Sequence, residues 1–121
     1  MKVLIIDDED DIRRIARLSL GVGGMEVVEA GSGADGVLKA AAEKPDAVLL
    51  DMMMPVMDGP ATLAALRGDP RTAAIPVVFL TAKALSAEVE RLKALGARGV
   101  LTKPFDPMRL SSELRALLER S

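Results

Sequence analysis

Five short apolar segments divide the chain into nearly regular intervals. They span residues 3–6, 27–28, 47–50, 77–80 and 100–101. The first, third and fourth are continuous apolar runs rather than alternating ones, which is typical of strands covered on both faces. The sequence therefore predicts five short strands, of which the second is the weakest.

Between these strands the apolar positions repeat at helical spacing, which predicts five helices. The expected core-facing positions are Ile12, Ile15, Ala16 and Leu20; Val37, Leu38, Ala41 and Ala42; Leu63, Ala64 and Leu66; Leu85, Val89, Leu92 and Leu95; and Leu110, Leu114, Leu117 and Leu118. Glycines follow the first and fourth of these segments, where helices commonly end. Strand–helix alternation predicts an α/β fold, a doubly wound parallel sheet with helices on both faces and right-handed crossovers. No linker or repeat interrupts the pattern, so we expect one domain over residues 1–121.

The composition narrows the chemistry that this domain can perform. Half of the 121 residues are apolar, the net charge is −2, and there is neither Cys nor His. Disulfides and thiolate or imidazole metal sites are excluded, and no basic excess favours a nucleic-acid or membrane partner. The apolar runs are much shorter than a bilayer span requires, and no signal peptide is visible. We therefore expect a soluble, cytoplasmic protein.

Polar side chains follow four of the predicted strands. Asp7 and Asp8 come directly after the first strand, Asp51 after the third, Thr81 after the fourth and Lys103 after the fifth. In an open parallel sheet, ligands bind at the carboxyl ends of the strands, so these groups are directed to one edge.

Three carboxylates at one edge favour a hard cation, because close like charges raise one another's pKa unless a cation intervenes. With oxygen ligands only, Mg²⁺ is the first choice, and Mn²⁺ is a substitute. Lys103 adds a positive charge and Thr81 a hydroxyl. A carboxylate, a Mg²⁺ site, an ammonium and a hydroxyl suit phosphoryl transfer, with Asp51 as the nucleophile.

Each of these residues also has a structural interpretation when it is taken alone. Acidic residues at a helix start commonly cap the helix or interact with its dipole, which is the preferred interpretation of Asp10 and Asp11. Thr81 alone reads as a cap or turn residue, and Lys103 as a solvated loop lysine. The run of three methionines at residues 52–54 is interpreted as gap-filling. The functional interpretation depends on joint placement after different strands.

At the level of motifs, the whole chain resembles the receiver domain of two-component response regulators. The resemblance is carried by Val-Leu-Ile-Ile-Asp7-Asp8-Glu9, by Leu49-Leu50-Asp51-Met-Met-Met-Pro55-Val-Met-Asp58-Gly59, by Val-Phe-Leu-Thr81-Ala82, and by Gly96-Ala97 followed by Leu-Thr-Lys103-Pro104-Phe105. Each motif is moderately specific, and all of them in this order are highly specific.

The resemblance implies a flavodoxin-like (CheY-like) sheet with strand order 2-1-3-4-5. It implies that Asp51 accepts a phosphoryl group from a phosphohistidine on a sensor histidine kinase or phosphotransfer protein. It makes Asp8, Asp51 and the backbone carbonyl of Met53 the Mg²⁺ ligands, with Asp7 acting through a metal-bound water. Lys103, preceding a cis Pro104, would pair with Asp51 and then with the phosphoryl group, and Thr81 would follow that group.

The resemblance further implies a signalling switch rather than an enzyme, which assists its own phosphorylation and dephosphorylation. Its partners would be the kinase or phosphotransfer protein and a downstream protein target, with no nucleic acid or membrane, as a monomer or a phosphorylation-dependent dimer. The family commonly has an aromatic residue where this chain has Val100. We therefore expect either a switch that uses loop motion and Thr81 alone, or a different partner surface. Met53 and Lys83 lie two positions after Asp51 and Thr81, where they could shield the acyl phosphate, and slow self-dephosphorylation is expected.

Four other interpretations remain open. A degenerate receiver would be a phosphorylation-independent binding module. A phosphohydrolase with an Asp nucleophile usually has a second Asp two residues later, where this chain has Met53. A flavin or nucleotide carrier needs a Gly- or Ser/Thr-rich phosphate loop after the first strand, where this chain is acidic. The domain could also have been cut from a longer regulator or hybrid kinase.

Overall fold

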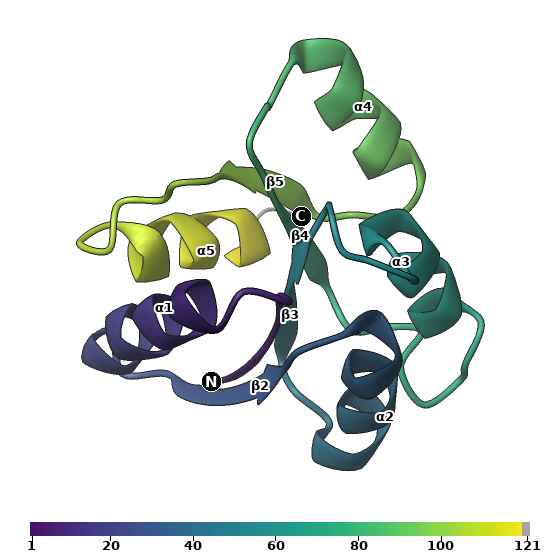
Figure 1. Ribbon diagram of the computed structural model, residues 1–121, viewed down its shortest axis with the longest axis horizontal. Helices are drawn as coiled ribbons and strands as arrows, with labels where there is room; N and C mark the ends of the chain where they lie inside the picture. Colours follow the sequence, from purple (N-terminus) through teal and green to yellow (C-terminus); the bar gives the residue numbers. More distant parts are fainter. Residues whose placement is uncertain (120–121) are drawn as a thin grey trace.

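Five strands alternate with five helices in the computed structural model, which describes residues 1–119 (Figure 1). The elements are β1 (Lys2–Ile6), α1 (Asp10–Val22), β2 (Glu26–Ala30), α2 (Gly33–Glu43), β3 (Ala47–Asp51), α3 (Gly59–Arg67), β4 (Val77–Thr81), α4 (Ser86–Ala94), β5 (Gly99–Thr102) and α5 (Leu110–Glu119). Within the described range, no helix has both the length and the apolar character needed to cross a bilayer.

The five strands form one parallel sheet in the order β2-β1-β3-β4-β5. This order confirms the predicted α/β fold and its doubly wound, flavodoxin-like topology. β3 and β4 are buried along their whole length and β1 along all but its first residue, in agreement with their continuous apolar runs.

Helices cover both faces of the sheet and create two apolar cores. Figure 1 shows α1 and α5 on one face and α2, α3 and α4 on the other. Successive residues of β1 point to opposite faces: Val3 and Ile5 pack with α1 and α5, whereas Leu4 and Ile6 pack with the other three helices. This alternation is the normal period of a strand, so each central strand contributes to both cores.

The buried face of α2 differs from the predicted one. Gly33, Gly36 and Ala40 are buried, whereas Leu38 is exposed. A Cβ atom on Gly36 would lie 2.4 Å from Cδ1 of Ile6, so the missing side chain lets the helix approach β1 closely. The prediction was wrong because it followed the larger apolar residues and ignored glycine as a packing residue.

The prediction for α4 was also wrong in part. Leu92 is buried, but Leu85 and Leu95 are exposed. Similarly, Ile15 of α1 is exposed although it was expected to face the core. These apolar side chains keep helical spacing but lie away from the buried faces of their helices.

Candidate functional site

The carboxyl-terminal edge of the sheet gathers the polar residues that were predicted to meet there. Ile6 pairs with Leu50 in the β1–β3 register, so Asp7 and Asp51 leave adjacent strands at the same level. Thr81 is the last residue of β4, and Lys103 follows the end of β5. The parallel topology alone therefore brings four distant parts of the chain together.

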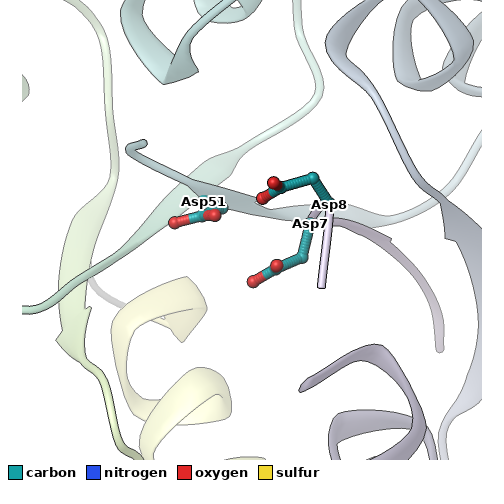
Figure 2. Close-up of side chains that lie close together, drawn as sticks. All are labelled: Asp7, Asp8 and Asp51. Atoms are coloured by element: carbon teal, nitrogen blue, oxygen red, sulfur yellow. The ribbon is translucent and has the colours of Figure 1, made fainter. Parts of the chain in front are cut away.

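Asp7, Asp8 and Asp51 form a compact carboxylate cluster. One oxygen from each lies within 4.8 Å of the others. Figure 2 shows the three side chains extending toward a common space from the ends of β1 and β3. Asp7 is fully buried and Asp51 is 3 % exposed, whereas Asp8 is exposed. A set of oxygen donors of this kind suits a hard divalent cation.

Asp51 is an ionisable group in a place that disfavours its charge. Burial, together with the negative charge of Asp7, raises the pKa of Asp51 from its ordinary 3.8 to about 6, although Lys103 and the Met53 amide oppose the shift. At neutral pH the carboxyl group is therefore mainly ionised, at a cost that a nearby cation would relieve.

The Lys103 ammonium lies among carboxylates at this edge. Its Nζ atom is 3.1 Å from Asp7 Oδ2, 3.2 Å from Glu9 Oε1 and 3.4 Å from Asp51 Oδ1. Burial alone would lower the pKa of Lys103, but the hydrogen bond to Asp7 and the charges of Asp7 and Asp51 outweigh it and raise that pKa. The bond between Lys103 and Pro104 is cis, as the resemblance implies.

The β3–α3 loop is tightly organised beside Asp51. The Met53 amide donates to Asp51 Oδ1 at 3.3 Å, and the Gly59 amide donates to the Met52 carbonyl at 3.0 Å. A Cβ atom on Gly59 would lie 2.6 Å from the Asp51 carbonyl oxygen, so only glycine allows this approach. Asp58 caps α3 by accepting from the Ala61 amide at 2.9 Å. Helix α3 therefore begins at Gly59, directly after its cap.

The three methionines of this loop have different surroundings. Met54 is buried in the core and Met52 is partly buried against it, so the gap-filling interpretation is confirmed for these two. Met53 is 79 % exposed, and for this residue the interpretation was wrong. Met53 instead lines a hollow of about 210 Å³ that Asp51, Thr81 and Lys103 also line.

Thr81 is buried, and its hydroxyl is already engaged in a local turn. Oγ1 donates to the Lys83 carbonyl at 3.1 Å and accepts from the Lys83 amide at 3.3 Å. The hydroxyl thus ties the end of β4 to the loop before α4.

Two further residues in and next to the acidic loop were not singled out from the sequence. Glu9 reaches the Lys103 ammonium, and Arg13 donates to the Asp7 carbonyl at 2.5 Å and pairs with Asp10. Asp10 and Asp11 lie in the first turn of α1, as expected for partners of the helix dipole. Neither of them caps the helix, because the cap position is occupied by Glu9, whose side chain makes no capping hydrogen bond. The run of acidic residues after the first strand was the only signal for Glu9.

Comparison with known proteins shows which family the chain belongs to. The sequence model of the response regulator receiver domain family matches residues 3–115. The chain belongs to this family. The match covers every motif that carried the resemblance, and the chain is therefore a receiver domain of two-component signalling systems.

Relatives of known name support the assignment. The chain is 35 % identical over 99 % of its length to the alkaline phosphatase synthesis transcriptional regulatory protein PhoP of Bacillus subtilis. It is 41 % identical over 98 % of its length to the transcriptional regulatory protein KdpE of Mycobacterium tuberculosis. It covers 49 % of the first protein and 51 % of the second, so the chain spans about half the length of these curated relatives.

Solved structures agree with the observed fold. The chemotaxis protein CheY4 of Vibrio cholerae is similar with a TM-score of 0.89 and 34 % identity, over 96 % of this chain and 97 % of that one. A response regulator of Chloroflexus aurantiacus gives a TM-score of 0.87 at 31 % identity, with 98 % of each chain covered.

Proposed function

We propose that Asp51 is the phosphoacceptor of this receiver domain and takes its phosphoryl group from a phosphohistidine on a sensor histidine kinase or phosphotransfer protein. The observation that carries this proposal is the position of Asp51, a nearly buried carboxylate 3.4 Å from the Lys103 ammonium and within the cluster that includes Asp7 and Asp8. A buried carboxylate with a cation site and an ammonium beside it is suited to phosphoryl transfer.

The carboxylate cluster fits a resident Mg²⁺, with Mn²⁺ as a substitute. Asp8, Asp51 and the Met53 carbonyl would bind the ion directly, and Asp7 would act through a bound water. The fit is supported by the close carboxylate oxygens and by the raised pKa of Asp51. Both indicate repulsion between negative charges that a bound cation would reduce. When bound, Mg²⁺ supplies positive charge that neutralises phosphoryl oxygens.

The chain's own residues would perform the transfer as follows. A carboxylate oxygen of Asp51 attacks phosphorus, the new oxygen–phosphorus bond forms, and the phosphorus–nitrogen bond of the phosphohistidine breaks, leaving the electron pair on the imidazole. Lys103 pairs with a phosphoryl oxygen. Thr81 donates its hydroxyl to the phosphoryl group, which requires it to give up its bond to the Lys83 carbonyl.

Loss of that bond would change the loop before α4 and so switch the surface offered to partners. Val100 stands where the family commonly has an aromatic residue, and it is partly buried against the core formed with α2, α3 and α4. The switch in this chain therefore depends on Thr81 and the loop rather than on a rotating ring. Chemical-shift mapping with a phosphoryl mimic would test this, and shifts confined to the acidic pocket would contradict it.

The receiver would act as a switch that assists its own phosphorylation and dephosphorylation. Its output partner would be a protein, with no nucleic acid or membrane contacted by this domain, which would work in the cytoplasm as a monomer or a phosphorylation-dependent dimer. The one-domain assignment of residues 1–121 also remains a prediction.

Labelling with a small phosphodonor tests the function. Incubation with acetyl phosphate and Mg²⁺ should add one phosphoryl group to the wild-type chain, as measured by intact-protein mass spectrometry, and omission of Mg²⁺ should abolish labelling. Asp51→Asn should remain unlabelled, whereas Asp106→Asn, at an exposed position, should label normally. A wild-type chain that no phosphodonor labels would favour the degenerate receiver instead.

A further inference from the structure

The Lys103 ammonium is shared among three carboxylates in this structure. It donates to Asp7 Oδ2 and to Glu9 Oε1, and it forms an ion pair with Asp51 Oδ1. An ammonium has three N–H donors, so three acceptors use its full capacity. A phosphoryl group that arrives at Asp51 can bond to Lys103 only by displacing one of them.

Of the three acceptors, Glu9 is the one that is easiest to displace. Asp7 is fully buried, and the Asp51 side chain is 5 % exposed, whereas the Glu9 side chain is 60 % exposed. A carboxylate that leaves the ammonium can be solvated by water only if it is exposed, and a buried one cannot. When a new acceptor reaches Lys103, Glu9 is therefore the first of the three carboxylates to leave the ammonium.

Glu9 also places negative charge beside the acceptor. It lines the same hollow of about 210 Å³ as Asp51, Met53, Thr81 and Lys103. It is not a member of the close carboxylate cluster that Asp7, Asp8 and Asp51 form. An anion entering this hollow meets the Glu9 charge and must also compete with it for the ammonium.

We propose that Glu9 is a positioning residue that holds the Lys103 ammonium in the resting protein and competes with the incoming phosphoryl group for it. This inference rests on the proposed function of Asp51. Removal of the Glu9 charge with retention of its size weakens its hold on Lys103, because an amide oxygen accepts a hydrogen bond more weakly than a carboxylate. It also lowers repulsion in the hollow, so the affinity for phosphate-like anions rises.

The experiment is an orthophosphate titration of the ¹⁵N-labelled protein with saturating Mg²⁺ at constant ionic strength, followed through the amide resonances of Met53 and Thr81. Glu9→Gln should lower the phosphate dissociation constant about threefold to tenfold, as expected for one partly screened charge at short range. Asp11→Asn is the matched control, because Asp11 lies two residues away and pairs with Arg14 instead of Lys103. It should leave the dissociation constant nearly unchanged.

A second measurement reads the contact with Lys103 directly. In the protein without phosphate, Glu9→Gln should accelerate exchange of the Lys103 ammonium protons with water, observed by ammonium-selective NMR, and Asp11→Asn should not. Unchanged or weaker phosphate binding in Glu9→Gln, absence of phosphate binding in every variant, or unaltered ammonium exchange would overturn the proposal. Phosphate binding requires no transfer to Asp51, so this result stands apart from the acetyl phosphate labelling that tests the function.

Discussion

At the scale of single residues, Asp51 combines burial with a charge that Lys103 and the Met53 amide compensate only in part. Its pKa is about 6 in the folded chain and 3.8 as its ordinary value. As pH rises between these values, the unfolded chain loses the proton first, so the folded state binds more protons and becomes less stable. The free energy of unfolding is therefore highest below about pH 4, where Asp51 is protonated in both states. It falls as pH rises and reaches its lower level above about pH 6, where Asp51 is ionised in both.

This linkage predicts the effect of Asp51→Asn in the absence of divalent ions. The variant should be more stable than the wild type by about 2–3 kcal/mol above pH 7, because one pKa unit corresponds to about 1.4 kcal/mol. The difference should fall to nearly zero at pH 3.5. Urea unfolding of both proteins across this range measures it, and a difference independent of pH would show that ionisation of Asp51 is not its cause.

Met53 and Lys83 are expected to affect how fast the phosphorylated protein loses its phosphoryl group. Met53 is exposed beside the hollow, and Met53 and Lys83 both line a second hollow next to Thr81. An apolar side chain and a long basic one at these places should exclude or misalign the water that hydrolyses the acyl phosphate.

Met53→Asn and Lys83→Glu should each shorten the phosphoryl lifetime, with a combined effect on the order of tenfold, equivalent to about 1.4 kcal/mol in the barrier. Decay of the phosphorylated mass after removal of the phosphodonor gives the lifetime. Met108→Asn and Lys93→Glu are controls, since Met108 and Lys93 are exposed and line neither hollow. Equal lifetimes in all five proteins would mean that shielding is not the function of these two side chains.

At the scale of elements, α3 and α4 have the same length but very different support. Both contain nine residues, yet α3 buries Gly59, Thr62, Leu63 and Leu66, whereas α4 buries only Leu92. The Asp58 side chain caps α3, and α4 begins after Leu85 without a side-chain cap. Local opening costs least where few apolar contacts must be broken, so α4 is the helix that can respond to a change at Thr81.

Hydrogen exchange should therefore be faster in α4 than in α3 under native conditions. Exchange measured by mass spectrometry on peptides that cover residues 59–67 and 86–94 compares the two helices directly. Slower exchange in α4 would contradict the view that its loose packing prepares it to move.

At the scale of the whole molecule, the sequence determined the sheet more clearly than the helix faces. Continuous apolar runs such as residues 77–80 predicted buried strands because they are too short for a helix and rich in β-branched or aromatic residues. Which face of a helix is buried depends on how closely the helix can approach the sheet. Gly36 allows such an approach to Ile6, but a glycine adds nothing to the apolar pattern of the sequence.

The same distinction applies to the candidate site. Asp7, Asp51, Thr81 and Lys103 could be placed together because parallel strands deliver their carboxyl ends to one edge. The contact of Glu9 with Lys103 could not be predicted, since it depends on how far two flexible side chains reach. The exposure of Met53 likewise depends on the path of the loop between β3 and α3.

The most direct test of the account locates the phosphoryl group itself. After labelling with acetyl phosphate and Mg²⁺, borohydride reduces an acyl phosphate of aspartate to homoserine, and peptide mass spectrometry identifies the converted residue. The account predicts homoserine at position 51 and at no other position. Conversion of Asp7 or Asp8 with Asp51 intact would contradict it.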